Sequence, residues 1–339
     1  MSAPAPVAVL IVAFRSRDTI PQVVAALEAQ TVRPARVRIL ENGSPEAERV
    51  DAGALPDWVE LIESPDNLGF AAGNNRLAQG VSEDWILLLN PDAFPEPDMI
   101  AQLLGAIRRH PQAALFGATQ LAHGAPGVLD GAGDVYHFTG LPYRAGYGRE
   151  SAPPPEGEVF GPCGALSLIR RDLFETLGGF DEDYFCYVED VDLAYRARLA
   201  GHHAIQVRDA RVSHMGYASS GRRSAFATYH GARNRFWTFF KNTPAPLLPL
   251  LAPVHVGVTL LLWASAARFG QFTLFGKAMK DAVRGWPRLM EKRRAVQAAR
   301  RVSALKIAGQ LSWNPLNLLT RAPDVRPVRS APAAQTERR

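Results

Sequence analysis

Continuous apolar runs alternate with stretches of helical periodicity through the first two-thirds of the chain, and this rhythm constrains the fold more than any other feature. Val7–Phe14 has the length and composition of a strand that is covered on both faces. Further strands are predicted at Arg36–Glu41, Trp58–Glu63, Trp85–Asn90 and Ala113–Gln120, and helices at Asp18–Gln30, Gly73–Gln79 and Pro97–His110. This repeated β-α-β order predicts an α/β fold with a mixed, mostly parallel sheet flanked by helices.

The rhythm is interrupted between residues 122 and 158, which carry many Gly, Pro and aromatic residues without a clear period. We expect a long excursion there in the form of an irregular hairpin. Regular structure should return at Gly161–Arg170, with a short helix at Asp172–Leu177 and another from Glu189 to Gly201. One large domain is therefore expected over residues 1–242.

Composition and charge indicate the compartment and the kind of partner. Two cysteines, Cys163 and Cys186, are too few for a disulfide framework and fit a reducing compartment. The first residues lack the positive charge and cleavage pattern of a signal peptide. Residues 268–339 contain 16 Lys and Arg but only 4 Asp and Glu. Since the net charge of the whole chain is +5, residues 1–267 carry a net charge of −7. We expect a cytoplasmic protein that does not bind nucleic acid and whose basic end meets an anionic surface.

The second part of the chain combines an apolar and a basic segment. Asn242–Ala267 contains 26 residues without a formal charge, but four prolines interrupt its first half. It could dip into one leaflet of a membrane, cross it, or form a buried helix of a soluble fold. The Arg- and Lys-rich stretch Arg288–Lys306 then favours peripheral attachment to the inner face of the cell membrane. Residues 243–320 are predicted to be a helical, membrane-associating extension, and residues 321–339 a disordered tail.

Two polar clusters follow predicted strands, where an open α/β sheet binds its ligands. The cluster after the second strand contains Glu41 and Asn42, which could hydrogen-bond a base or ribose or form an ordinary turn. The next one, Asn67–Asn75, contains Asn67, Gly69 and Asn74 ahead of a helix, and it suits a phosphate or ribose. It equally fits a plain loop-to-helix junction.

Carboxylates mark two further clusters. Asn90-Pro91-Asp92 ends an apolar strand, where the Asp92 carboxylate could hold a divalent cation or stand in a turn. Six acids occur within residues 181–192, among them Glu189, Asp190 and Asp192 at the start of a predicted helix. The interleaved aromatic residues would create a partly dry setting that suits a general base. His214 could complete a Mg or Mn site or be a structural histidine.

In this order, the clusters resemble glycosyltransferase family 2, which has the Rossmann-like GT-A fold, and within it the rhamnosyltransferases of bacterial surface-polysaccharide assembly. The matching segments are VAVLIVAFRS, ILENGS, NLGFAAGNN, WILLLNPDA, GPCGALSLIRRDLFETLGGFDEDYFCYVEDVDLAYR and VSHMG, over residues 7–240. Each motif is weak alone, but the ordered set is specific.

The resemblance implies a role for each cluster. Glu41 matches the acid that contacts the nucleobase, where the family usually has Asp. Asn90-Pro91-Asp92 matches the family's Asp-x-Asp motif, which leaves Asp92 as the main metal ligand with His214, and Asn90 as a donor contact. Asp190, next to Glu189, matches the catalytic base. Arg233 and Arg235 on a predicted helix would meet the diphosphate or an acceptor, as would Asp192, or form a solvated helix face.

The implied reaction is an inverting, Mg- or Mn-dependent transfer of a sugar from a nucleoside diphosphate to a hydroxyl of a glycan or lipid-linked glycan, with dTDP-rhamnose as the expected donor. Two alternatives stay open. A sugar-1-phosphate nucleotidyltransferase would need a Gly-rich loop after the first strand, and Ala13–Arg17 contains no glycine. A non-catalytic nucleotide-sugar-binding assembly protein would not need Asp92, Asp190 and His214 together.

Overall fold

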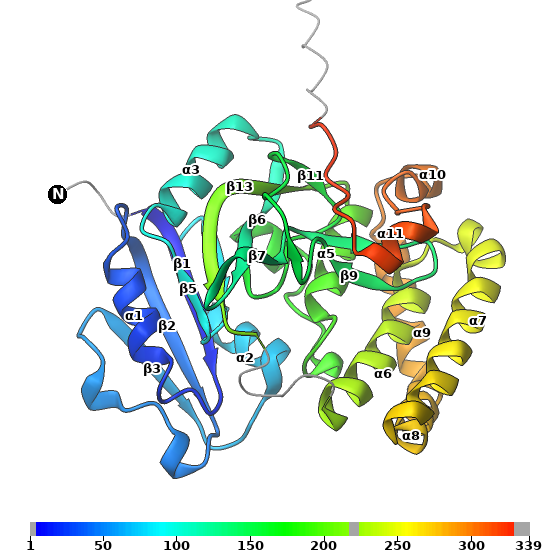
Figure 1. Cartoon of the computed structure of the whole chain (residues 1–339), viewed down its shortest axis with the longest axis horizontal. Helices are drawn as coiled ribbons and strands as arrows, with labels where there is room; N and C mark the ends of the chain where they lie inside the picture. The colour runs from blue at the N-terminus through cyan, green and yellow to red at the C-terminus, as the bar shows by residue number, and fades with distance from the viewer. Residues whose placement is uncertain (1–4, 217–223, 329–339) are drawn as a thin grey trace, which may run out of the picture.

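The computed structural model describes residues 5–216 and 224–328. Four parallel strands in the order β3-β2-β1-β4 form one half of the central sheet (Figure 1). They are β1 (Ala5–Ala13), β2 (Pro34–Asn42), β3 (Val59–Ser64) and β4 (Trp85–Leu89), each within a few residues of its predicted position. Their carboxyl ends therefore meet at one edge, where sequence reasoning expects the ligand.

The other half of the sheet is mixed. Strand β12 (Leu166–Arg170) lies antiparallel between β4 and β6 (Ala113–Ala122), and β13 (His203–His214) runs parallel to β6. The short strand β5 (Ala93–Pro95) pairs with the last residues of β13. This confirms the expected mixed sheet with a parallel core, and it brings the ends of β4 and β13 to the same edge.

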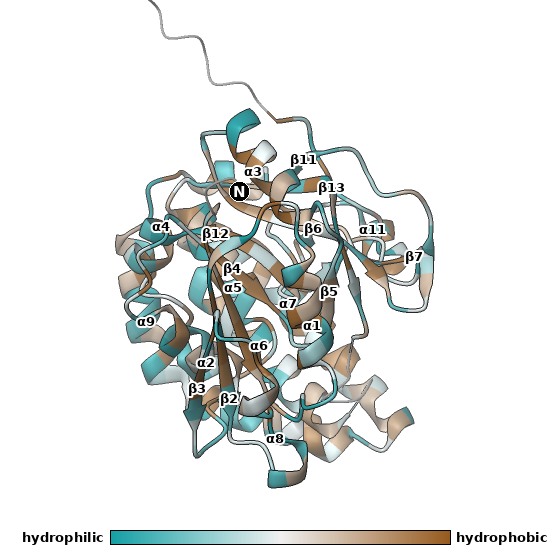
Figure 2. Ribbon diagram, turned by 90° about the vertical axis from the view of Figure 1, so that its left-hand side faces the viewer, coloured by the Kyte–Doolittle hydropathy of each residue, from teal (hydrophilic) through white to brown (hydrophobic). Residues whose placement is uncertain are grey.

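Helices cover both faces of the sheet, as the apolar strands require. On one face α1 (Ile20–Glu28) and α3 (Met99–Arg109) pack on Val9 and Ile11 of β1. On the other, Leu10 joins a core with α2 (Gly69–Ala78), α4 (Arg171–Thr176) and α5 (Glu189–Leu199). Figure 2 shows the strands mainly in the apolar colour between helices of mixed colour. One-turn 3-10 helices occur at Glu46–Glu48, Ala52–Ala54, Glu182–Tyr184, Ala245–Leu247 and Ala267–Phe269.

The predicted excursion forms short strands instead of one hairpin. They are β7 (Ala125–Gly131), β8 (Asp134–Tyr136), β9 (Pro142–Arg144), β10 (Arg149–Glu150) and β11 (Gly157–Val159). Strands β8 and β9 make a separate two-stranded sheet, whereas β7, β10 and β11 join the edge of the main sheet. The excursion therefore forms a wall beside the carboxyl ends of β6 and β13.

The C-terminal region is helical, with α6 (Ala225–Asn242), α7 (Leu248–Ala266), α8 (Phe272–Arg284), α9 (Trp286–Ala298), α10 (Ala304–Ala308) and α11 (Pro315–Thr320). These helices lie at the opposite end of the molecule from β1–β3 (Figure 1). A third apolar core joins Tyr136 and Tyr195 of the body to Phe239, Leu251 and Ile307. The extension is thus packed on the body and is not an independent appendage.

Helix α7 with its flanking turns, Ala245–Phe269, is the segment of the described chain that is long and apolar enough to cross a bilayer, with a hydropathy of 1.9 over its most apolar window. Only 17% of that window is buried, which does not fit the alternative of a core helix. Its exposed apolar side chains include Leu250, Leu260 and Leu261.

The expectation of a disordered tail from residue 321 is wrong for its first part. Arg326 forms a two-way backbone bridge with Glu158, at 2.8 and 2.7 Å. Tyr143 donates a hydrogen bond to the Ala322 carbonyl at 3.0 Å, and Val325 packs on the core of the body. Residues 329–339 lie outside the described part of the chain. Sequence reasoning missed this packing because an irregular segment has no period to read.

A buried ionic network joins α5 to α6. The Asp192 carboxylate is fully buried and pairs with Lys241 at 2.8 Å and Arg196 at 2.8 Å. Tyr184 and Asn242 donate further hydrogen bonds to it, at 3.2 and 2.7 Å. Burial opposes ionisation, but Lys241 and Arg196 outweigh it and lower the pKa of Asp192. The network is therefore a structural joint between the body and the helical extension.

Replacing Asp192 by Ala should lower the free energy of unfolding by about 3–5 kcal/mol, because Lys241 and Arg196 would remain buried without their shared partner. Urea unfolding measures this. Asp172→Ala is the matched control: its carboxylate is 64% exposed and pairs with Arg170 at the surface, so about 0–1 kcal/mol is expected. Equal losses in the two variants would contradict this account.

Candidate active site

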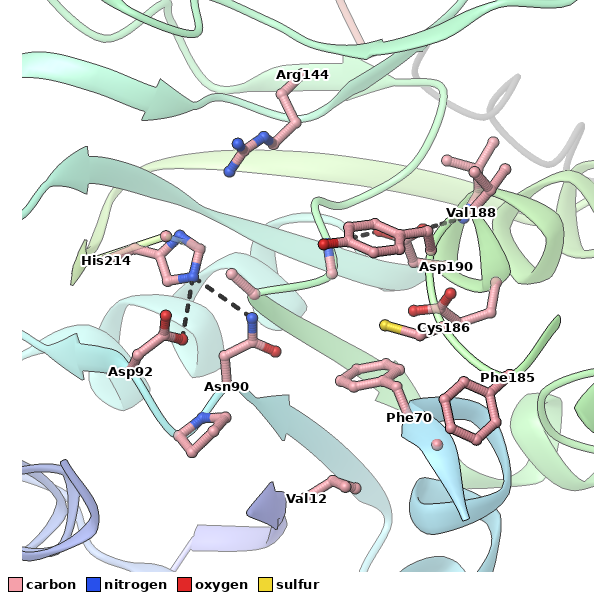
Figure 3. Close-up of a pocket in the computed structure, with 18 of the residues that line it drawn as sticks. Val12, Phe70, Asn90, Asp92, Arg144, Phe185, Cys186, Val188, Asp190 and His214 are labelled. Carbon is pink, nitrogen blue, oxygen red and sulfur yellow. Dashed lines mark hydrogen bonds and ion pairs between the residues drawn. The ribbon is translucent and has the colours of Figure 1, made fainter. Parts of the chain in front are cut away.

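A cavity of about 610 Å³ opens at the carboxyl edge of the sheet, within the size range of sites for small molecules. It is walled by the ends of the parallel strands, the start of α5 and the excursion. Figure 3 shows Asp92, Asn90 and His214 on one side of it, Asp190 and Cys186 on the other, and Arg144 above them. Of the predicted site residues, the cavity is lined by Asn42, Asn67, Gly69, Asn90, Asp92, Glu189, Asp190 and His214.

The strand ends supply a polar corner of the cavity. Asn42, the last residue of β2, donates to the Asn67 side chain at 3.0 Å and accepts from the Leu68 amide at 2.9 Å. Asn67 in turn accepts from the Gly69 amide at 2.9 Å. Gly69 has a φ of +78°, and a Cβ there would lie 2.5 Å from the Phe185 carbonyl oxygen. These residues shape the loop before α2, and their side of the cavity is where the sequence predicts contacts to a phosphate or ribose.

Two residues predicted to bind the donor do not reach the cavity. Glu41 is fully buried, and its two oxygens accept hydrogen bonds from the Ser44 and Val50 amides, both at 2.8 Å. Asn74 is also buried and donates to the Phe70 carbonyl at 2.9 Å. Their donor-binding role is therefore corrected: both hold the backbone behind the cavity wall. Sequence position alone could not tell an inward-facing carboxylate from one that faces a ligand.

Asp92 and His214 form the predicted pair of candidate metal ligands. Asp92 Oδ1 lies 3.3 Å from His214 Nε2, and Asn90 Nδ2 lies 3.4 Å from the same nitrogen. Two ligands about 2.1 Å from one ion, at right angles to each other, are about 3 Å apart, so the pair fits a small divalent cation. Within the described residues, no group of three or more His, Cys, Asp and Glu side chains could hold a metal alone. A cation here would need oxygen ligands from a substrate.

Asp130 supports His214 from behind, and sequence reasoning missed it. Its Oδ2 lies 2.7 Å from His214 Nδ1 and 2.5 Å from Arg144 Nη1. Burial opposes protonation of His214, but the hydrogen bonds and charges of Asp130 and Asp92 raise its pKa to about 9. A carboxylate on the second ring nitrogen is the usual support of a metal-binding histidine. Asp130 lies in β7 of the excursion, whose irregular sequence carried no signal for this contact.

Asp190 and Glu189 begin α5 on the opposite side of the cavity. Asp190 accepts hydrogen bonds from the Gly164 amide at 3.0 Å and the Val191 amide at 2.8 Å. Burial raises the pKa of Asp190, and these amides limit the rise. Glu189 is also buried, its Oε2 has no hydrogen-bond partner, and burial next to Asp190 raises its pKa well above the usual value. The pair can therefore hold one ionised and one neutral carboxyl group.

The loop before α5 is strained and held by one amide side chain. Phe185, Tyr187 and Val188 have φ values of +62°, +71° and +70°, which are costly for such residues. The fully buried Asn234 side chain donates to the carbonyls of Tyr184, Cys186 and Tyr187 at 2.8–2.9 Å. Sequence reasoning gave roles to its neighbours Arg233 and Arg235 but none to Asn234. Its signal was only its place in the Arg-Asn-Arg motif.

Three residues predicted to meet the acceptor or diphosphate lie elsewhere. Arg233 donates to the Asp183 and Tyr184 carbonyls at 2.9 and 3.1 Å and stacks on Trp237. Arg235 donates to the Gly231 carbonyl at 3.0 Å, and burial lowers its pKa to about 10. Asp192 belongs to the buried network. None of the three lines the cavity, so their predicted role is corrected to a structural one.

The sequence of the chain is similar to those of known glycosyltransferases. The profile described as "Glycosyltransferase like family 2" matches residues 4–238. The N-acetylglucosaminyl-diphospho-decaprenol L-rhamnosyltransferase of Mycobacterium tuberculosis is 30% identical over 255 residues, covering 66% of this chain and 80% of the relative. The O-antigen biosynthesis protein RfbC of Myxococcus xanthus is 29% identical over 237 residues, 63% of this chain and 18% of that protein.

Solved structures show the same fold at low identity. The mannosyltransferase PcManGT from Pyrobaculum calidifontis, in complex with GDP-Man and Mn2+, matches with a TM-score of 0.51 and 17% identity over 91% of this chain and 88% of its own. GalNAc-T7 with UDP, GalNAc and Mn2+ matches with a TM-score of 0.54 and 14% identity over 71% of this chain, which spans about half of that protein (48%). This chain therefore belongs to the glycosyltransferase-like family 2 and is a glycosyltransferase of the GT-A fold.

Proposed function

We propose that the protein is an inverting, divalent-metal-dependent glycosyltransferase that moves a sugar from a nucleoside diphosphate to a hydroxyl acceptor. The observation that carries this is that Asp92 with His214, and Asp190, face one cavity from opposite sides. One group suits a cation on the leaving diphosphate, and the other suits the proton of an attacking alcohol. The fold and the family support the same reaction class.

Asp92 and His214 would hold the cation, with Asp130 fixing the ring of His214. A divalent cation there would supply a Lewis acid that neutralises charge on the donor diphosphate. Two solved structures of the same fold, PcManGT and GalNAc-T7, contain Mn2+, which supports Mn or Mg here. Asn42, Asn67, Gly69 and Asn90 line the same cavity and would contact the donor beside this pair.

Asp190 would act as the base for the acceptor hydroxyl. Its two backbone amide contacts fix the carboxylate while leaving lone pairs free, since each oxygen accepts more than one hydrogen bond. The acceptor oxygen forms the new bond to the anomeric carbon as the bond to the diphosphate oxygen breaks, and its proton passes to Asp190. A single displacement of this kind inverts the anomeric carbon.

The donor and acceptor are proposed from the mycobacterial relative, whose name gives L-rhamnose as the sugar and a diphospho-decaprenol-linked N-acetylglucosamine as the acceptor. We propose dTDP-rhamnose as the donor and a lipid-linked glycan as the acceptor. A lipid-linked acceptor would be reached at the inner face of the membrane through α7, whose exposed leucines and following basic helix α9 suit an anionic surface.

Replacing Asp190 by Asn should lower kcat by about 10²–10⁴-fold while donor binding persists, because only the proton acceptor is lost. Turnover of labelled dTDP-rhamnose and donor titration separate the two effects. Since burial raises the pKa of Asp190 and the base must be ionised, wild-type kcat should fall with decreasing pH at values above about 3.9, the ordinary pKa of Asp. Glu189→Gln, which changes the adjacent carboxyl group with the raised pKa, should lower kcat much less than Asp190→Asn does. Full turnover by Asp190→Asn would remove it from the mechanism.

Replacing Asp92 by Ala should abolish Mn-dependent donor binding, and Asp130→Asn should weaken Mn binding by about 10–100-fold, because His214 loses its support. Calorimetric titration of Mn in the presence of dTDP measures both. Asp98→Asn is the matched control, since this carboxylate, six residues after Asp92 in the chain, is exposed and does not line the cavity. Donor binding and activity that persist in excess chelator would exclude the metal role.

Leu260 and Leu261 on α7 are 55% and 71% exposed, so changing both to Ser should reduce binding to anionic vesicles by at least tenfold. Flotation with vesicles measures this. Leu305→Ser is the control, because Leu305 is 81% exposed but belongs to α10 and not to α7. Equal flotation of wild type and the double variant would argue against membrane contact through α7.

A further inference from the structure

The C-terminal segment Pro315–Arg326 runs along the excursion and reaches the cavity. The Arg321 carbonyl accepts a hydrogen bond from the Gly146 amide at 2.7 Å, and Arg149 donates to the Thr320 carbonyl at 3.3 Å. Gly157 makes room for the segment, since a Cβ there would lie 2.6 Å from the Arg326 carbonyl oxygen. In Figure 1 the red α11 lies beside β9. The segment is therefore held at several points along the cavity wall.

This packing brings Arg321 into the lining of the cavity, on the side of β9. Arg321 ends α11 with a φ of +51°, a conformation that costs energy for any residue with a Cβ. Its guanidinium lies 5.0 Å from the ring centre of Tyr147, and the guanidinium of Arg144 lies 4.5 Å from the same ring. Two cations that line one cavity thus lie on a shared aromatic ring.

The charges around the two arginines are unequal. Arg144 is paired with Asp130, and its positive charge also acts on Asp134 and Asp190. Arg321 is exposed and forms no ion pair with any carboxylate in residues 5–216 and 224–328. A cationic side chain that lines the cavity without a carboxylate partner among the described residues is suited to an anionic group of a substrate.

We propose that Arg321 and Arg144 form a subsite for a diphosphate group, and that the C-terminal segment is thereby part of the active site. This subsite rests on the proposed function. It adds a binding contact for a second diphosphate group, one that Asp92 and His214 do not hold. A donor diphosphate would lie at Asp92 and His214, whereas Arg321 comes from the same extension as the apolar helix α7. The position of Arg321 therefore favours the diphosphate that links an acceptor sugar to its lipid. Planar guanidinium groups bind phosphate oxygens in pairs.

The test compares the binding of two acceptors: N-acetylglucosamine linked through a diphosphate to a farnesyl chain, and the same sugar on a neutral octyl chain. Arg321→Gly should weaken binding of the diphosphate acceptor by about tenfold, the loss expected for one hydrogen bond to a charged group, and leave the neutral acceptor unaffected. Glycine also relieves the positive φ, so the melting temperature should stay the same or rise. Arg321→Lys should restore part of the affinity because it keeps the charge.

Arg208→Ala is the matched control, since it removes an exposed arginine of the body that does not line the cavity. If Arg321→Gly weakens the binding of dTDP-rhamnose instead, the subsite holds a diphosphate but the donor's. If it binds all three ligands like wild type, the proposal is overturned. Binding is measured apart from turnover, so a wild-type protein that transfers no rhamnose would count against the proposed function and not against this subsite.

Discussion

The site depends on one backbone pairing, that of β5 with the end of β13. Ala93 is opposite His214 in this antiparallel pair, and the Met215 amide donates to the Asp92 carbonyl at 3.0 Å. These hydrogen bonds hold two segments far apart in the sequence at one sheet edge, so that the Asp92 carboxylate and the His214 ring lie within 3.3 Å. Without that pairing, the Asp92 carboxylate and the His214 ring would not lie side by side.

The opposite side of the cavity is held by a different kind of interaction. The loop that ends at Val188 adopts left-handed conformations that its residues do not favour, and the buried Asn234 carboxamide satisfies three of its carbonyl groups. The Asp192 network then ties the start of α5 to α6. The position of Asp190 is thus maintained by α6 of the C-terminal helical region, although Asp190 itself belongs to the body.

The C-terminal helical region, residues 225–328, has three structural features. It closes the third apolar core, it carries the exposed apolar helix α7, and its last described segment lines the cavity with Arg321. Burial of apolar side chains stabilises the contact with the body, whereas the exposed leucines of α7 gain nothing from the folded chain alone. The exposed apolar helix and the cavity wall therefore belong to one packed region of the chain.

The sequence by itself determined the α/β fold, the positions of the strands along the chain and the candidate residues at the strand ends, because continuous apolar runs and polar strand ends are local patterns. Val7–Phe14, Trp85–Asn90 and the helix from Glu189 needed no tertiary information, and Asp92, Asp190 and His214 line the cavity. Only the tertiary structure decided which way each polar side chain faces. Glu41 and Asp192 lie inward in hydrogen-bond networks, whereas Arg144 and Arg321 line the cavity and Asp130 contacts His214 from segments without periodicity. Burial and pairing depend on neighbours distant in sequence, and no local pattern encodes them.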